Sequence, residues 1–399
     1  MDKDIIQLGK PCGSGRIIIN GVQENREYYR VPISKLFYND QNGRVASFIS
    51  GYNSKENNTP LNTLDIDKYN NIIMGFVKES GSQDKYNKTK DSIRKTGQMR
   101  QGIILRDGRV IDGNRRFTCL RELYEETKDE RYAYFECFVL DVPATEDEKK
   151  AIKTLELKYQ FGEDEKEKYN PIDYLVSIYE CLVKEPVQYE PEEYIERING
   201  QETLTRLKTS IEKAKIMVDY LDTIGFPNRF DIARKDKIDG PIEELARLKK
   251  KIGENRWKVE KRTIFENLNA ELKTAGDTTR KIREFIKVFE NNPEEYKKIK
   301  DRLFRLSSMR MNGDSHNSLA YNDELSKTII QLNESKAIVK KNEAQSKQIN
   351  IIKSALNKLK EVDKYELIQY YKINKEEVDK ELDNIEKIIN ELRKCDISR

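Results

Sequence analysis

Apolar residues occur in short, strand-like runs over the first 140 residues and at three- and four-residue spacing over the rest of the chain. Residues 16–19 and 28–33 are β-rich runs bounded by Gly and Asn. Residues 102–105 and 109–111 flank an Asp-Gly pair, which supplies the positive φ of a tight hairpin turn. Residues 132–140 resemble another buried strand. These runs predict a small mixed sheet near the N-terminus.

The segments between these runs differ in character. Residues 50–90 are polar and contain Asn-Asn-Thr-Pro and Ser-Gly-Ser stretches, so they predict an irregular insertion, with regular patterning resuming at Asp91. A helix is expected directly after the hairpin, because Phe117, Leu120 and Leu123 follow one another at helical spacing. Cys119 falls on this helix beside Leu120, which favours a buried core thiol.

From Glu146 onward the pattern is helical, with prolines and glycines as punctuation. Residues 238–241, Ile-Asp-Gly-Pro, predict a turn that divides this part. The fold class expected is therefore α+β: a mixed-sheet domain over residues 1–145, a helical domain over 146–238, and a helical bundle or coiled coil over 239–399.

Composition narrows the possible functions. The 399 residues carry 74 Lys and Arg against 70 Asp and Glu, which disfavours a broadly basic nucleic-acid coat. No apolar run approaches the roughly 20 residues that cross a bilayer, so we expect a cytoplasmic protein without membrane contact. Five cysteines without C-x-x-C spacing argue against a disulfide framework or a zinc site. His316, the one histidine, excludes mechanisms that need a histidine pair.

Residues 112–116, Asp-Gly-Asn-Arg-Arg, lie between a predicted strand and a predicted helix. Free N–H groups and the positive end of the helix dipole gather at such a turn and attract anions. Gly113 allows a phosphate to approach the backbone, and Arg115 and Arg116 add planar donors. Alternatively, Asp112 or Asn114 caps the helix and the arginines are solvated.

Three elements in order resemble the ParB/sulfiredoxin-like superfamily, which includes partition proteins and DGQHR-type proteins of bacterial defence. They are a strand leading to an N-x-x-x-R-like element over residues 31–44, an S-I-x-x-x-G-Q element at 92–98, and the turn at 112–116. The resemblance covers roughly residues 28–143. It implies a small mixed-sheet domain that binds a nucleoside triphosphate, with CTP, ATP and GTP not distinguished.

The resemblance also implies residue roles. Arg115, Arg116 and the Gly113 backbone would hold phosphates, Arg44 would lie near the nucleotide, and Gly97 and Gln98 would border its base or ribose. The full nucleotide-binding set is Asn42, Arg44, Gly97, Gln98, Asp112, Gly113, Asn114, Arg115 and Arg116. An ordinary turn is the alternative for residues 42–44.

Partition proteins of this superfamily also carry an E-N-x-x-R element that helps to place magnesium. Glu156 matches its acid, whereas Leu157 and Gln160 replace the Asn and Arg. The resemblance thus implies a possible Mg²⁺ ligand in Glu156 and slow triphosphate hydrolysis, with Arg116, Glu156 and Gln98 as catalytic residues. Asn114 replaces the sulfiredoxin cysteine, which disfavours that chemistry. The acids that a nuclease needs do not converge.

Residues 193–200 and 203–218 are patterned as helix, turn, helix. In a DNA-binding unit of this kind Thr205, Arg206, Lys208 and Thr209 would face the major groove, although similar helix pairs occur in proteins that never touch DNA. The leading hypothesis is a slow NTPase acting on or near DNA in a phage, plasmid or defence setting. The alternative is a non-enzymatic DNA-binding adaptor with a nucleotide-gated clamp. The C-terminal helices would then serve a homodimer or a partner protein.

Overall fold

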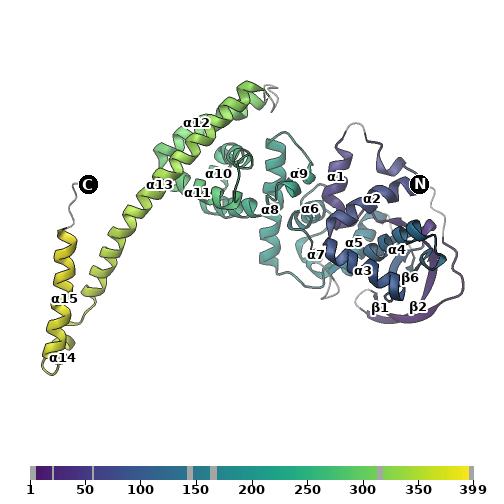
Figure 1. The fold of residues 1–399 in the computed structure, drawn as a ribbon, viewed down its shortest axis with the longest axis horizontal. Coiled ribbons are helices and arrows are strands. Elements are labelled where there is room, and N and C mark those ends of the chain that lie inside the picture. The colour runs from purple at the N-terminus through teal and green to yellow at the C-terminus, as the bar shows by residue number, and fades with distance from the viewer. Residues whose placement is uncertain are drawn as a thin grey trace.

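The computed structural model describes residues 6–19, 22–55, 58–141, 147–161, 169–311 and 318–394. The molecule is elongated, with a mixed-sheet domain at one end and helices extending to the other (Figure 1). The predicted α+β fold class is confirmed. In the parts of the chain described here, no helix combines the length and apolar character that crossing a membrane requires.

Six strands form one sheet in the order β1-β2-β6-β4-β5-β3. The strands are β1 (Gly13–Ile19), β2 (Val22–Pro32), β3 (Phe37–Tyr38), β4 (Gly102–Leu105), β5 (Arg109–Asp112) and β6 (Tyr134–Leu140). The hairpin β4–β5 turns at Gly108, whose φ is 90°, as the Asp-Gly pair predicts. β3 pairs with β5 in parallel, so the carboxyl ends of these two strands meet at one edge of the sheet.

Helices cover both faces of the sheet. They are α2 (Ile66–Ser80), α3 (Gln83–Thr96) and α4 (Asn114–Thr127) on one face and α5 (Glu148–Phe161) on the other. Successive residues of β4 divide between the faces: Ile104 packs with Phe117 of α4, while Ile103 packs with Ile152 of α5. Burial on both sides explains why β4 has no polar side chain.

The predicted irregular insertion over residues 50–90 is wrong, because the segment contains the second half of α1 (Ala46–Asn53), all of α2 and the beginning of α3. Two polar residues mark the helix starts. Asp65 accepts a hydrogen bond from the Lys68 N–H, and Ser82 accepts one from the Lys85 N–H. The polar composition therefore reflects capping residues and solvated helix faces.

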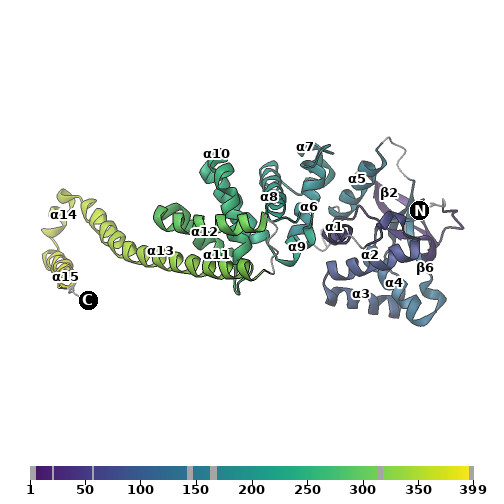
Figure 2. The same cartoon turned by 90° about the horizontal axis from the view of Figure 1, so that it is seen from above.

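The remainder is helical. The helices are α6 (Pro171–Leu182), α7 (Pro191–Arg197), α8 (Leu204–Thr223), α9 (Phe230–Lys235), α10 (Asp239–Glu271), α11 (Thr278–Asn291), α12 (Pro293–Met311), α13 (Leu319–Lys360), α14 (Lys364–Tyr371) and α15 (Lys375–Arg393). One hydrophobic core extends through this part from Leu157 to Val339. Figure 2 shows these helices following one another along the long axis, away from the sheet.

The turn predicted at residues 238–241 is also wrong. Gly240 and Pro241 lie in the first turn of α10, where a proline sacrifices no helical hydrogen bond because its N–H would have no acceptor there. The backbone instead departs from helical geometry at Gly253, whose φ is 80°.

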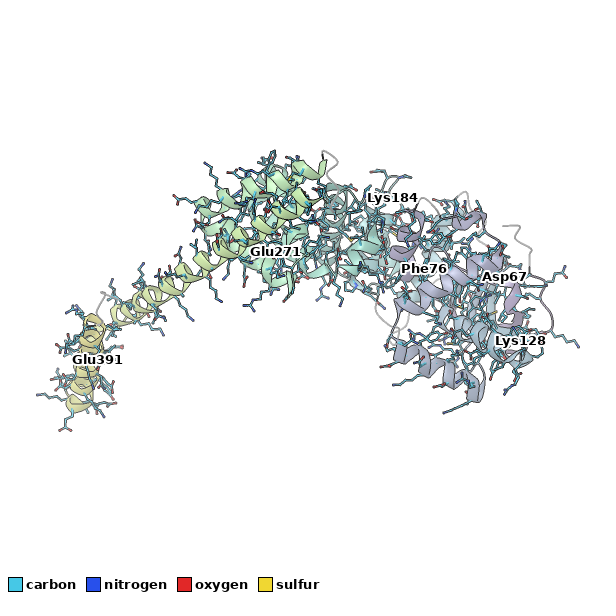
Figure 3. The ribbon with its side chains drawn as sticks, turned by 45° about the horizontal axis from the view of Figure 1, so that its top comes forward. Asp67, Phe76, Lys128, Lys184, Glu271 and Glu391 are labelled. Atoms are coloured by element: carbon cyan, nitrogen blue, oxygen red, sulfur yellow. The ribbon has the colours of Figure 1, made fainter. Side chains whose placement is uncertain are left out.

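The mixed-sheet domain joins the helical part through α1. The buried carboxylate of Asp173 on α6 accepts hydrogen bonds from Ser47 of α1 and from Arg234 of α9. The Arg234 guanidinium lies 4.5 Å from the ring centroid of Phe48. Phe76 and Lys184, labelled in Figure 3, lie on the two sides of this junction, while Glu391 lies at the far end of the molecule.

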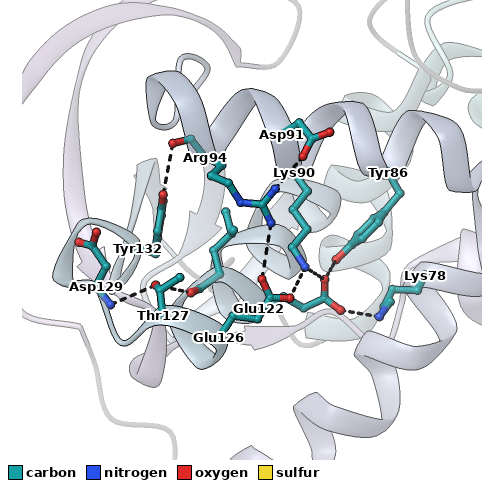
Figure 4. A network of polar contacts seen from close by, with 11 residues as sticks. Lys78, Tyr86, Lys90, Asp91, Arg94, Glu122, Glu126, Thr127, Asp129 and Tyr132 are labelled. Carbon is teal, nitrogen blue, oxygen red and sulfur yellow. Dashed lines mark hydrogen bonds and ion pairs between the residues drawn. The ribbon is translucent and has the colours of Figure 1, made fainter.

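Glu122 fastens α4 to α2 and α3 (Figure 4). Its carboxylate accepts hydrogen bonds from Lys78, from Tyr86 at 2.6 Å and from Lys90 at 2.8 Å. Burial acts to raise the pKa of Glu122, but these donors outweigh burial and lower the pKa to about 2. The ionised carboxylate therefore holds the helix that carries residues 114–116.

We expect Glu122→Gln to lower the free energy of unfolding by about 1–3 kcal/mol at pH 7, because a charged acceptor shared by three donors is lost. The folded pKa lies below the ordinary 4.5, so the difference between wild type and variant should be complete above pH 4.5 and should vanish as the pH falls toward 2. Urea denaturation at several pH values measures it. A difference independent of pH would contradict this account.

Candidate functional site

The turn at residues 112–116 connects the end of β5 to the start of α4. The N-cap position falls on Gly113, rather than on Asp112 or Asn114 as the capping alternative would have it. In an α-helix the first-turn N–H groups have no acceptor within the helix, and they carry the positive end of the helix dipole. The structure thus places a helix N-terminus without a capping side chain at the N-cap position here.

Gly113 is the residue that this backbone requires. Its φ of 92° lies in the left-handed region, and an added Cβ would stand 2.9 Å from both Arg116 Nη2 and Phe135 Cζ. The close approach of α4 to β6 therefore depends on the missing side chain.

Arg116 stabilises this turn through two hydrogen bonds. Its Nη2 donates to the Gln101 carbonyl at 3.2 Å and to Asp112 Oδ2 at 3.3 Å, which connects α4 to the residue before β4 and to the end of β5. The side chain is 20% exposed, so solvent still reaches it. Arg115 is the neighbouring residue of the same helical turn and is partly exposed. Asn114 is buried, and its Oδ1 has no hydrogen-bond partner among the described residues.

A cavity of about 280 Å³ adjoins the turn at Asp112. Three basic side chains line it from separate parts of the chain: Arg16 of β1, Arg100 before β4 and Lys158 of α5. Burial and the charge of Arg197 lower the pKa of Lys158. The cavity thus carries three basic side chains together with the carboxylate of Asp112.

Sequence reasoning missed these three cavity residues, because the pairing of β1 with β2 and the packing of α5 on the sheet bring them together. For two of these residues the sequence did contain an indication, because they lie beside or within motifs already identified. Arg100 lies two residues after Gln98, which ends the second motif, and Lys158 lies two residues after Glu156 in the element compared with E-N-x-x-R.

The turn at residues 42–44 lies at the same edge of the sheet, because β3 runs parallel to β5. Asn42 is buried and its Oδ1 accepts the Arg44 N–H at 3.0 Å, which closes a 3-10 turn over Gly43–Val45. The Arg44 guanidinium lies 5.4 Å from the ring centroid of Tyr169. Asn42 therefore shapes the turn, and Arg44 packs on an aromatic ring.

Glu156 is fully buried and bonded within the protein. Its Oε1 accepts from Tyr169 at 2.7 Å and from the Gly43 N–H at 3.3 Å, and its Oε2 accepts from Lys153 at 2.9 Å. A metal ion would have to displace these donors, and the adjacent ammonium would repel it. The arrangement does not fit a magnesium ligand, and in the described ranges no three His, Cys, Asp or Glu side chains gather as a metal site.

Gln98 and Gly97 connect α3 to the sheet. The Gln98 Nε2 donates to the Glu136 carbonyl at 2.7 Å, and its Oε1 accepts the Glu136 N–H at 2.9 Å. Gly97 ends α3 with a φ of 76°. The Gln98 side chain thus extends the hydrogen bonding of β6, and the loop after it delivers Arg100 and Gln101 to the cavity.

Thr205, Arg206, Lys208 and Thr209 are exposed on the first turns of α8, while Leu207 and Ser210 between them are buried. α8 follows α7 after a short turn. It belongs to the helical part (Figure 1), so the structure does not bring these residues to the turn at 112–116.

Two further residues from the sequence analysis are Cys119 and His316. Cys119 is buried, and burial raises its pKa to about 12, so it is the core thiol expected. His316 lies outside the described residues.

No protein-family model and no curated protein matches this sequence. Among solved structures, the chain is similar to a Pnob8-like ParB-N domain. The identity is 13%, the match covers 69% of this chain and 96% of that one, and the TM-score is 0.35.

Gly113→Ala should destabilise the protein more than Gly225→Ala. Both positions have a positive φ, which costs an alanine about 1–2 kcal/mol, but Gly225 faces open space whereas Gly113 meets Arg116 and Phe135. We expect a loss of about 1 kcal/mol for Gly225→Ala and roughly 2–4 kcal/mol for Gly113→Ala, measured by urea denaturation. Equal losses would mean that the close contacts at Gly113 relax freely.

Proposed function

We propose that the mixed-sheet domain binds a nucleoside triphosphate by its phosphates, held by the N-terminus of α4 and the adjoining basic cavity. One observation carries the proposal: Arg16, Arg100 and Lys158, from three distant segments, line a cavity that opens beside Asp112 at a helix N-terminus. An anion in this cavity would be attracted by all three basic side chains, and the Asp112 carboxylate in the same lining would oppose it.

The binding chemistry follows from these groups. The first-turn N–H groups of α4 donate to phosphate oxygens, and the planar Arg115 and Arg116 side chains add paired donors. Arg116 already bonds the carboxylate of Asp112, and a phosphate would take the place of that carboxylate. Asp112 thus competes with the ligand for Arg116.

We further propose that the nucleotide acts as a switch rather than as a rapidly hydrolysed substrate. Gln98 and Glu156 use their polar atoms on the backbone, on Tyr169 and on Lys153. This engagement favours the non-enzymatic, nucleotide-gated alternative over turnover. CTP, ATP and GTP share the triphosphate that this site would bind. The identity of the base is therefore a question for experiment.

Titration of the full chain with ATP, GTP, CTP and tripolyphosphate tests the site. Arg115→Gln and Lys158→Gln should each raise the dissociation constant about tenfold, because each removes a charge that faces the phosphates. Arg121→Gln is the matched control, since this arginine lies further along α4 and bonds Asn71. Its affinity should stay within about twofold of wild type.

Asp112→Asn should act in the opposite direction and tighten binding, since it removes the competing carboxylate from Arg116. No binding of any triphosphate, or equal losses in Arg121→Gln and Arg115→Gln, would refute the site.

We also propose that α8 contacts DNA. Its exposed first turns carry Arg206 and Lys208 beside two threonines, a set suited to phosphate and base-edge contacts.

Lys208→Glu should weaken binding of duplex DNA about tenfold and reduce the dependence of affinity on salt, because one phosphate contact is lost. Lys215→Glu, further along the same helix where Lys215 bonds Glu212, serves as the control. Fluorescence anisotropy at 50 and 200 mM salt gives both quantities. Equal weakening in the two variants would mean that general charge, and not the start of α8, governs binding.

A further inference from the structure

A cavity of about 880 Å³ lies beside β3, the strand at one edge of the sheet. Its walls are α1, residues 58–62 and the beginning of α5, and its base is formed by buried side chains of β3, α2 and β5. Among the described residues, its lining shares none with the basic cavity beside Asp112. Sites for small molecules have volumes of roughly 300–1,000 Å³, so this cavity is large enough for one.

The deepest polar group of the cavity is an arginine that packs on an aromatic ring. The Arg109 guanidinium lies 5.2 Å from the ring centroid of Phe37, and the Arg109 side chain is only 9% exposed. Its Nη1 donates to Asp40 Oδ1 at 2.8 Å, so the charge is already neutralised. Its Nε has no hydrogen-bond partner among the described residues, although Asp107 Oδ2 lies 3.6 Å from it. The base thus presents a planar donor group whose hydrogen bonds are not all used.

Amide side chains form most of the polar part of the walls. The four that line the cavity are Gln41, Asn53, Asn58 and Asn62. Two hydrogen bonds hold residues 58 and 59 to α1: Asn58 Nδ2 donates to the Tyr52 carbonyl at 2.8 Å, and the Tyr52 hydroxyl donates to the Thr59 carbonyl at 3.1 Å. An amide both donates and accepts, so these walls complement ligand groups that do both, as a hydroxyl does.

The charges of the lining favour an uncharged ligand. Three acidic residues, Asp40, Asp147 and Glu148, line the cavity together with two basic residues, Arg109 and Lys149. The acidic residues would oppose an anion and the basic residues would oppose a cation, whereas neither set opposes an uncharged molecule. This balance differs from the basic cavity beside Asp112, where three basic side chains meet one carboxylate.

Aromatic rings supply the apolar part of the lining. Phe37, Tyr52 and Tyr69 all contribute to it. An aromatic ring covers the C–H face of a sugar ring, while amide groups bond the hydroxyls at the edge of the same sugar ring. The lining therefore matches an uncharged, polyhydroxylated ring, either free as a sugar or as the ribose of a nucleoside.

α1 has two faces with different neighbours, because it lies between α2 and α9 (Figure 2). Ile49, Tyr52 and Asn53 share the face toward the cavity, at spacings of three and four residues. Ser47 and Phe48, on the other side of the helix, contact α6 and α9. A ligand in the cavity therefore covers one face of the helix whose other face joins the sheet domain to the helical part.

We propose that this cavity is a ligand site of its own, which binds an uncharged, polyhydroxylated ring compound and thereby fixes α1. Arg109 donates to an oxygen of the ligand, the wall amides bond its hydroxyls, and the aromatic rings cover its C–H face. The site does not depend on phosphate binding at residues 112–116, because the two cavities are lined by different residues.

Isothermal titration calorimetry of the full chain tests the site with glucose, N-acetylglucosamine, myo-inositol, ribose, adenosine and uridine. At least one of these compounds should bind with a dissociation constant below about 1 mM, which is within reach of ligands of this size. Binding of the free rings alone identifies a sugar, and binding of adenosine or uridine alone identifies a nucleoside. No binding of any of these compounds would overturn the proposal.

Asn62→Trp and Asn53→Trp assign the binding to this cavity. Both asparagines are exposed, so the indole should fill the cavity without unfolding the protein and raise the dissociation constant at least about tenfold. Asn322→Trp, exposed on α13, is the matched control and should stay within about twofold of wild type. Affinity for tripolyphosphate should be unchanged in all three variants, which separates failure of this site from failure of the phosphate site. Equal affinities in the three variants, or loss of tripolyphosphate or spermidine binding in the two cavity variants alone, would contradict the proposal.

Hydrogen exchange measures the effect on α1. A ligand at about ten times its dissociation constant should slow exchange of the α1 amides roughly tenfold, because openings that release the ligand become rarer by that factor. The amides of α15, at the far end of the molecule, should not change. Binding that leaves α1 exchange unaltered would show that the ligand lies elsewhere.

Discussion

The carboxylate of Glu156 links the main parts of the molecule. It lies on α5, which covers one face of the sheet, and it accepts hydrogen bonds from Gly43 in the turn after β3 and from Tyr169 at the approach to α6. Lys153 neutralises it one helical turn away. A buried charge is costly unless it is paired and hydrogen-bonded, so removing any one donor would leave the buried carboxylate less well stabilised. The turn at residues 42–44, the packing of α5 and the start of the helical part thus depend on one group.

This constraint connects the candidate site with the helical part. The turn fixed by Glu156 leads directly into α1, and α1 bonds Asp173 and Arg234 through Ser47 and Phe48. A ligand that shifts the edge of the sheet would act on α1 and, through it, on α6 and α9. The edge of the sheet is therefore connected to α6 and α9 by direct contacts through α1.

Some segments of the fold could be predicted from the sequence and others could not, for physical reasons. The Asp-Gly hairpin, the helix after Gly113 and the strand around Phe135 follow local rules of backbone geometry and periodicity, and the structure has all three. The prediction for residues 50–90 is wrong because Asp and Ser are common both in loops and at the N-caps of helices. Asp65 and Ser82 are N-cap residues here. The turn predicted at Gly240 and Pro241 is wrong for a related reason. Residue types that are common in loop turns, proline above all, are also accepted in the first turn of an α-helix.

The sequence by itself determined the elements with local causes: the strand-to-helix turn at residues 112–116, the buried strands and the helical character after Glu146. Only the tertiary structure decided what those elements surround. Arg16, Arg100 and Lys158 are distant in sequence and meet because the sheet pairs non-local strands and α5 covers one face. Glu156 matched a metal-binding motif, yet its burial beside Lys153 makes it a structural acceptor. The environment of a charge, set by contacts between remote segments, determines its chemistry, and no local pattern records that environment.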